Sequence, residues 1–166
     1  MTVAVVMGSD SDYGVMEGAV TTLREHGVVP LVRVVSAHRD SAAMLAFAQE
    51  ARADGIDVII AAAGGAAHLP GMIASATTVP VIGVPIGRPH LDGLDSLLSI
   101  CQMPAGVPVA TMAIDGSVNA ALMALRILAV ADPEVAARLA AHQQSLREAV
   151  VDRDAKVQAR VAALDD

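Results

Sequence analysis

Two histidines and an arginine stand where a parallel sheet could bring them together for acid/base and anion-binding chemistry. The segment Ser36-Ala37-His38-Arg39 follows the apolar run Leu31–Val35, and His68 ends a glycine- and alanine-rich segment that follows the run Val58–Ala63. Imidazole titrates near neutrality and can carry a proton. A guanidinium group binds phosphate or carboxylate through several N–H donors. These residue types predict a site that moves protons on a small anionic molecule.

The loops after two further apolar runs add hydroxyls, carboxylates and another cation. Gly8-Ser9-Asp10-Ser11-Asp12 follows Val3–Met7, and the segment 85–93, which contains Arg88 and His90, follows Val79–Val84. Serine hydroxyls and free N–H groups at a helix start suit a phosphate group, and a carboxylate suits ribose hydroxyls. Convergence of all these loops on one edge of a sheet would make a binding site.

The glycine- and alanine-rich loop has its own chemistry. It reads Gly64-Gly65-Ala66-Ala67-His68-Leu69-Pro70-Gly71. Small side chains let backbone N–H groups approach a carboxylate or carbon dioxide directly. The loop has neither the Gly-Lys-Ser/Thr ending of a nucleotide-binding P-loop nor the Gly-x-Gly-x-x-Gly order of dinucleotide sites.

Each loop also has a purely structural interpretation. The loop after Val3–Met7 could be a turn with a helix cap, and Ser36–Arg39 could be a solvated connection. Gly64–Gly71 could serve close packing of a helix on the sheet. Sequence alone leaves these alternatives open.

The elements that must position these loops alternate regularly along the chain. Short β-branched runs predict strands, namely Val3–Met7, Leu31–Val35, Val58–Ala63, Val79–Val84 and Val107–Ile114. Helical spacing predicts six helices, most of them between strands. The first helix is capped by Asp12 and ends at Gly27, and the second is capped by Asp40 or Ser41 and ends at Gly55. The other four are His68–Ala76, Leu94–Ile100, a helix that begins near Val118, and a last helix from Pro133 to Leu164. This order predicts a single catalytic domain over residues 1–166 with a three-layer, doubly wound α/β/α fold and a parallel sheet.

Composition limits the function classes. The net charge is −7 and aromatic residues make up 1% of the 166-residue chain, which disfavours nucleic acid as a partner because phosphate backbones need a dense cationic surface. The longest apolar run is far shorter than the ~20 residues that span a bilayer. The N-terminus lacks a basic leader, so we expect a cytoplasmic protein. The lone Cys101 is expected to be buried, His26 to lie at a helix end, and His142 to be solvated.

The last predicted helix is longer than a domain of this size. At 1.5 Å per residue, residues 133–164 would span roughly 45 Å, against about 30–35 Å for the domain. Its apolar residues recur at helical spacing, at Val135, Leu139, Leu146, Val150, Val157, Val161 and Leu164. With 54% hydrophobic residues in the chain, this stripe predicts a subunit interface, since monomers rarely expose large apolar patches.

Together, these loops resemble those of the bacterial-type 5-(carboxyamino)imidazole ribonucleotide mutase family, an enzyme family of purine biosynthesis also classed as the catalytic subunit of class I phosphoribosylaminoimidazole carboxylase. The matching segments are Val6–Asp12, Ser36–Arg39, Ala63–Ile73, Leu94–Leu97, Gln102–Pro104 and Asn119–Leu122. The departures are Asp40-Ser41 in place of a frequent Thr-Pro, a short stretch from Asp115 to Val118, and Arg88-Pro89-His90 in a variable segment.

The resemblance implies a flavodoxin-like fold, a homo-octamer, and a reaction without metal or organic cofactor. It implies that His38 is the general acid/base and that Ser9, Asp12 and Arg39 bind the ribose phosphate. Residues Gly64 to His68 would enclose the migrating carboxylate. The full set of candidates is catalytic His38 and His68, and substrate-binding Ser9, Ser11, Asp12, Ser36, Ala37, Arg39, Gly64, Gly65, Ala66 and Leu69.

Two other functions remain open from the sequence. The nearer one is direct carboxylation of aminoimidazole ribonucleotide with carbon dioxide on the same scaffold, although the intact Gly64–Gly71 loop looks like the mutase type. The further one is a non-catalytic flavodoxin-like module, such as a flavin carrier or a phosphoacceptor receiver. Against it, the predicted site has no aromatic residue except Tyr13, and the only lysine is Lys156.

Overall fold

The structure, a computed structural model, describes residues 1–164 and contains a five-stranded parallel sheet with the strand order β2-β1-β3-β4-β5. The strands are β1 (Thr2–Met7), β2 (Leu31–Val34), β3 (Ile56–Gly64), β4 (Val81–Ile86) and β5 (Ala110–Thr111). This is the flavodoxin-like order, so the predicted doubly wound fold is confirmed. The predicted domain runs to residue 166, and its last two residues lie outside the described part.

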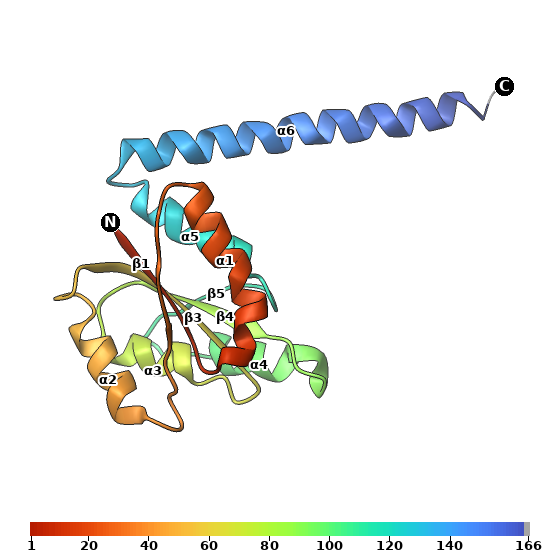
Figure 1. The fold of residues 1–166 in the computed structure, drawn as a ribbon. Helices are drawn as coiled ribbons and strands as arrows, with labels where there is room; N and C mark the ends of the chain where they lie inside the picture. The colour runs from red at the N-terminus through yellow and green to blue at the C-terminus, as the bar shows by residue number, and fades with distance from the viewer. Residues whose placement is uncertain (165–166) are drawn as a thin grey trace.

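Helices cover both faces of the sheet (Figure 1). They are α1 (Tyr13–Glu25), α2 (Ser41–Glu50), α3 (Leu69–Ala76), α4 (Leu94–Cys101), α5 (Ser117–Leu128) and α6 (Pro133–Ala162), with short 3₁₀ turns η1 (Asp10–Asp12) and η2 (Leu91–Gly93). One buried cluster joins alternate residues of β1 and β3 to α1 and α5. A second joins the opposite side chains of those strands to α2, α3 and Ile100 of α4.

β3 lies in the middle of the sheet and is buried on both faces. Ile59, Ile60 and Ala61 have no exposed surface, as expected of a central parallel strand covered by helices on either side. The strand ends in three alanines and Gly64, whose small side chains leave room for the loop that follows. β3 therefore sets the position of the glycine- and alanine-rich segment.

All five predicted strands differ from the structure in at least one bound, and two of them, β4 and β5, show why. β4 begins at Val81 instead of Val79, because its register against β3 pairs Ile59 with Val81. Only Ala110 and Thr111 of the predicted strand 107–114 pair with β4. This strand lies at the sheet edge, where Pro108 offers no N–H and the chain turns at Ala113–Gly116.

Three single-residue predictions also need correction. Cys101 is exposed, because the buried face of α4 carries Ser96 and Ile100, four residues apart. His142 is half-buried instead of solvated, with its ring 5.4 Å from that of His26. Asp12 lies at the N-cap position of α1, but its carboxylate makes no capping bond.

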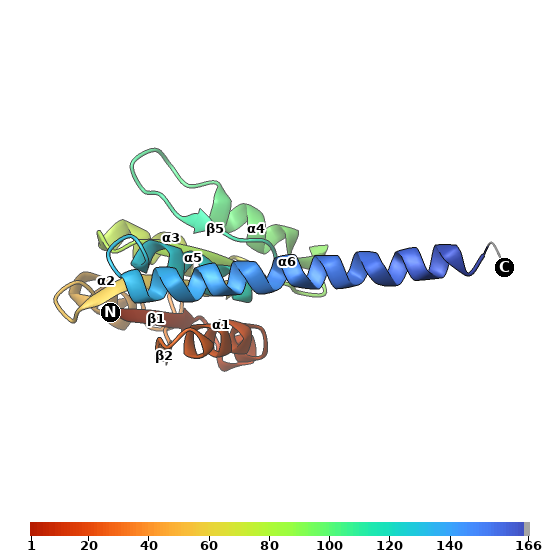
Figure 2. The ribbon, with the colours of Figure 1, turned by 90° about the horizontal axis from the view of Figure 1, so that it is seen from above.

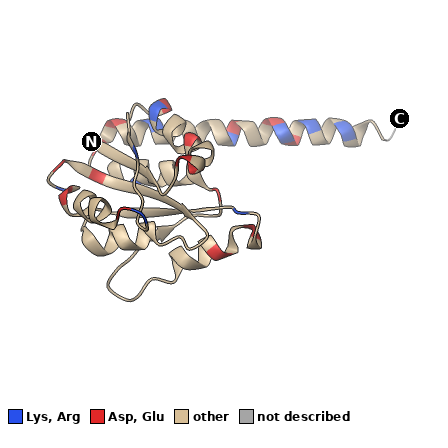
Figure 3. Cartoon of the chain, turned by 60° about the horizontal axis from the view of Figure 1, so that its bottom comes forward, with Lys and Arg blue, Asp and Glu red and all other residues tan. Residues whose placement is uncertain are grey.

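The last helix extends past the body of the molecule, as predicted (Figures 1 and 2). Its first turns are anchored: Val135 is buried, and Arg138 donates from Nη1 to the His26 carbonyl oxygen at 2.8 Å. Beyond them, Leu146, Val150 and Val157 are each more than half exposed. Figure 3 shows that acidic and basic residues alternate along this outer part. No helix among residues 1–164 is long and apolar enough to cross a membrane.

Candidate functional site

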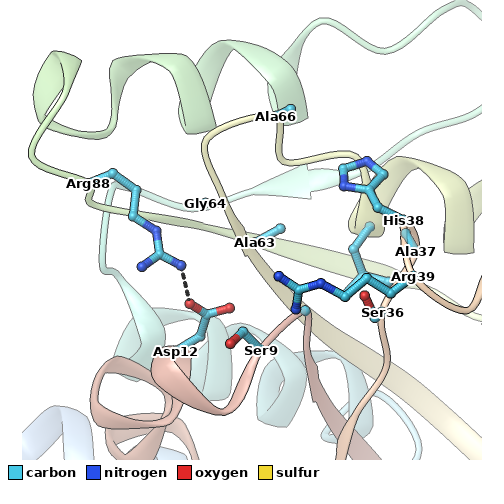
Figure 4. Close-up of a pocket in the computed structure, with 12 residues that line it drawn as sticks. Ser9, Asp12, Ser36, Ala37, His38, Arg39, Ala63, Gly64, Ala66 and Arg88 are labelled. Carbon is cyan, nitrogen blue, oxygen red and sulfur yellow. Dashed lines mark hydrogen bonds and ion pairs between the residues drawn. The ribbon is translucent and has the colours of Figure 1, made fainter.

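The carboxyl ends of β1 to β4 surround a cavity of about 210 Å³ (Figure 4). Its walls come from four loops, and the lining residues are Gly8, Ser9, Asp12, Ser36, Ala37, His38, Arg39, Ala63, Gly64, Ala66, Leu69 and Arg88. Ligands in doubly wound folds bind at this edge, where the strand order reverses. The cavity lies at that reversal point, beyond β1 and β3.

The loop after β1 forms one wall. Ser9 caps η1: its hydroxyl oxygen accepts from the Ser11 N–H at 3.3 Å and lies 3.0 Å from the Ser11 hydroxyl. Gly8 has open space where a side chain would stand, so this end of the strand leaves the cavity accessible. Ser9 lines the cavity, whereas Ser11 supports Ser9 without being part of the lining.

The loop after β2 forms the opposite wall. The Asp40 N–H donates to the Ser36 carbonyl at 3.0 Å, and the Asp40 carboxylate caps α2 by accepting from the Ala43 N–H at 3.0 Å. The resulting turn carries Ser36 to Arg39 along the cavity. Of the two predicted cap residues, Asp40 and Ser41, it is therefore Asp40 that caps α2, and this cap positions His38 and Arg39.

The loop after β3 is held by a serine of α4. The Gly65 N–H donates to Ser96 Oγ at 2.8 Å, and Ser96 Oγ donates to the Ile86 carbonyl at 2.7 Å. Ser96 has no exposed surface. Gly65 has φ +67°, a conformation that favours glycine. One hydroxyl thus joins the loops after β3 and β4.

The two predicted catalytic histidines contact each other. His38 Nε2 and His68 Nδ1 are 2.8 Å apart, with the ring planes at 87°. A nitrogen–nitrogen hydrogen bond needs a proton on one partner and a lone pair on the other. The pair can therefore pass a proton between loops that follow β2 and β3. His68 lies just outside the lining and reaches the cavity through His38.

The charges of the cavity come from two arginines and one buried carboxylate. Asp12 is 2% exposed, and its Oδ1 lies 2.6 Å from Nη2 of Arg88. Arg39 points toward the cavity from the β2 side, facing Arg88 across it (Figure 4). Two guanidinium groups against one carboxylate favour an anionic ligand. No group of three or more His, Cys, Asp or Glu side chains within residues 1–164 is placed to hold a metal ion.

Most predicted site residues gather in this cavity. Nine line it: Ser9, Asp12, Ser36, Ala37, His38, Arg39, Gly64, Ala66 and Leu69. Ser11, Gly65 and His68 lie directly behind it, each next to a lining residue or hydrogen bonded to one. Sequence reasoning did not name Gly8 and Ala63 as site residues, although both lie inside the motifs it used, and it left Arg88 without a role. Arg88 could have been recognised as a site residue, because it is a cation that follows the carboxyl end of a buried strand.

Comparison with known proteins identifies relatives along most of the chain. Residues 2–149 match the family model described as AIR carboxylase. The N5-carboxyaminoimidazole ribonucleotide mutase of Mycobacterium tuberculosis H37Rv is 56% identical over 94% of this chain and 90% of that protein. The protein of the same name from Saccharolobus solfataricus is 55% identical over 90% and 94%. The crystal structure of Treponema denticola PurE superposes with a TM-score of 0.85 at 28% identity, covering 93% of this chain and 97% of that one.

Replacing Ser96 tests the link between the loops. In Ser96→Ala, the Gly65 N–H and the Ile86 carbonyl both lose their hydrogen-bond partner, so we expect the free energy of unfolding to fall by about 1–3 kcal/mol. Urea unfolding at a fixed protein concentration measures this loss. Ser75→Ala in α3 is the matched control and should change stability little, because this serine is exposed and its hydroxyl donates within its own helix, to the Met72 carbonyl. Equal stability of both variants would show that the Ser96 hydroxyl does not hold the loops.

Proposed function

The chain belongs to the AIR carboxylase family, and on this premise we propose that it interconverts 5-(carboxyamino)imidazole ribonucleotide and 4-carboxy-5-aminoimidazole ribonucleotide. The carboxylate moves from the exocyclic nitrogen to carbon 4 of the imidazole. The observation that carries the proposal is the His38–His68 hydrogen bond at the edge of a cavity that also exposes the Gly64 loop and Arg39. The curated relatives named as mutases support the same reaction.

The proposed substrate groups match the walls of the cavity. Arg39 and the Ser9 hydroxyl bind the phosphate, because a guanidinium and free hydroxyl donors form charge-assisted bonds to its oxygens. Asp12 binds a ribose hydroxyl. The backbone around Gly64 and Ala66 holds the carboxylate in transit, with Leu69 as an apolar wall. Ser11, Ser36, Ala37 and Gly65 keep these groups in place.

The chemistry requires one proton to move as the carboxylate moves. When the exocyclic nitrogen receives one proton, the bond between that nitrogen and the carboxylate carbon breaks, which releases carbon dioxide and leaves a neutral aminoimidazole. Carbon 4 then attacks the retained carbon dioxide, and the proton on carbon 4 must leave. His38 gives a proton to the nitrogen and takes one from carbon 4, with His68 as its hydrogen-bond partner. Holding carbon dioxide within the cavity favours its recapture over its escape.

The proposed reaction needs no resident metal or organic cofactor, because the imidazole pair supplies the proton transfer. The cytoplasmic location stays a prediction, and so does the absence of a nucleic-acid partner, which the net charge of −7 supports. We assign the activity to the chain as one catalytic domain.

Turnover on defined substrates tests the proposal directly. We expect synthetic 5-(carboxyamino)imidazole ribonucleotide to be converted without added bicarbonate, because the carboxylate is carried by the substrate itself. Aminoimidazole ribonucleotide with bicarbonate should support much slower turnover. Efficient turnover of aminoimidazole ribonucleotide with bicarbonate, and none of 5-(carboxyamino)imidazole ribonucleotide, would identify the chain as a direct carboxylase instead.

Replacing His38 tests the proton transfer. His38→Asn keeps a polar side chain but cannot shuttle a proton, so we expect turnover to fall by about 10²–10⁴-fold while product binding is retained. His90→Asn is the control, since His90 lies outside the cavity lining. A near wild-type rate in His38→Asn would exclude His38 as the catalyst and make His68 the next candidate.

We also propose that the chain forms a homo-octamer through α6. The stripe of Leu146, Val150, Val157 and Val161 is more than half exposed in one chain, and a second copy would cover it. The number eight rests on the family resemblance.

Light scattering at micromolar concentration should give a mass near eight times the 16.9 kDa of one chain. Val157→Asp places a charge in the apolar stripe and should lower the assembled mass. Gln158→Asp adds the same charge at the neighbouring exposed position and should leave assembly unchanged. If the wild-type protein had the mass of a single chain, the proposed assembly would be refuted. If truncation before Leu146 left the assembled state unchanged, the role of α6 would be refuted.

A further inference from the structure

Arg88 belongs to the cavity but has no counterpart among the residues that the resemblance assigns. It follows the buried strand β4 and reaches past the end of β3 to the start of α1, where its Nη2 lies 2.6 Å from Asp12 Oδ1 (Figure 4). The arginine is 37% exposed, whereas the aspartate is 2% exposed. The ion pair therefore connects an accessible cation to a buried anion.

The surroundings of Arg88 hold it in this position. The N–H of the preceding Gly87 donates to Asp115 Oδ1 at 2.8 Å, which ties the base of the loop to the turn after β5. A Cβ on Gly64 would lie 2.5 Å from Arg88 Nε. The absence of a side chain at Gly64 is thus what lets the arginine lie against the end of β3.

The ion pair changes what Asp12 presents to a ligand. Within the described residues, the bonds to this carboxylate from Arg88 and from the Ser11 hydroxyl both reach Oδ1, which leaves Oδ2 for a ligand hydroxyl. A buried carboxylate without a cationic partner is costly and would repel an anion. With Arg88 beside it, the charge of Asp12 is balanced, and that of Arg39 remains for an anionic ligand.

We propose that Arg88 is a positioning residue that acts through Asp12: it orients the carboxylate toward a ribose hydroxyl and cancels its charge so that the anionic ribonucleotide can bind. This inference rests on the proposed function. Arg88 acts on substrate affinity and not on the proton transfer, because the bond runs to Asp12 and the histidine pair lies at the other side of the cavity (Figure 4).

Steady-state kinetics of Arg88 variants test the proposal. Arg88→Leu should raise KM by about tenfold or more, because it leaves the buried charge of Asp12 uncompensated, while kcat stays within about threefold. Arg88→Lys should restore most of the affinity, since it returns the positive charge. Arg24→Leu removes the same charge at the opposite end of α1 and should match the wild type. If Arg88→Leu does not fold, Arg88→Gln takes its place.

A double-mutant cycle separates action through Asp12 from direct contact with the substrate. In an Asp12→Asn background the buried charge is gone, so Arg88→Leu should raise KM by less than about twofold further. If Arg88→Leu raised KM as much in that background as in the wild type, Arg88 would be a direct ligand of the substrate and the proposal would be wrong. A wild-type KM in Arg88→Leu alone would also overturn the proposal. A wild-type enzyme that neither turns over the carbamate substrate nor binds 4-carboxy-5-aminoimidazole ribonucleotide in calorimetry would instead refute the proposed function.

Discussion

The pairing of β3 with β1 and β4 is the constraint on which the site depends. β3 is buried on both faces, and its register runs from Thr2 and Val81 at one end to Met7 and Ile86 at the other. Because these strands are parallel, their carboxyl ends lie at the same edge of the sheet. β1 ends opposite Ala62, and β4 ends opposite Gly64, two residues further along β3. The loops that follow must then share one edge of the sheet. The cavity is a consequence of this shared end, and no single loop could form it alone.

The loops still need contacts that fix them relative to one another, and polar side chains supply these. Ser96, Asp12 and Asp115 each join segments that are far apart in the sequence. Each bond starts or ends at the loop after β3 or after β4, where the chain is richest in glycine. Glycine lets the backbone approach closely, but it also gives freedom to the unfolded chain. The polar links limit this freedom in the folded state, so the cavity walls have defined positions.

Sequence patterns predicted the order and type of the elements well, because burial on both faces leaves β3 and β1 as uninterrupted apolar runs. The bounds of the edge strand β5 were harder to predict. Residues 107–114 are mostly apolar, yet only Ala110 and Thr111 pair with β4, because Pro108 and the turn at Asp115 interrupt the hydrogen bonds between the strands. The exposure of Cys101 depends on which face of a short helix meets the sheet. Such details are decided by tertiary packing and not by local spacing.

The same limit applies to the site. Residues in continuous motifs, such as Ser36 to Arg39 and Gly64 to Ala66, could be found from the sequence because type and order carry the signal. Of the two roles predicted for Asp12, the helix cap was wrong. Aspartate before a helix usually caps it, but here Asp12 pairs with Arg88, which is 76 residues away along the chain. The bond between His38 and His68 is also non-local, with a separation of 30 residues. Pairs of this kind follow from the strand order.

The strand order also explains how binding and proton transfer are divided. β1 lies between β2 and β3, so the loops that carry His38 and His68 are separated by the loop of β1, where Gly8 leaves open space. The two imidazoles meet across this gap, while Asp12 and Arg88 meet on the side of β4. A ligand in the cavity would therefore lie over the end of β1, with the histidine pair toward one side and the ion pair toward the other. Different loops would then set affinity and protonation, which is the division that the proposal for Arg88 requires.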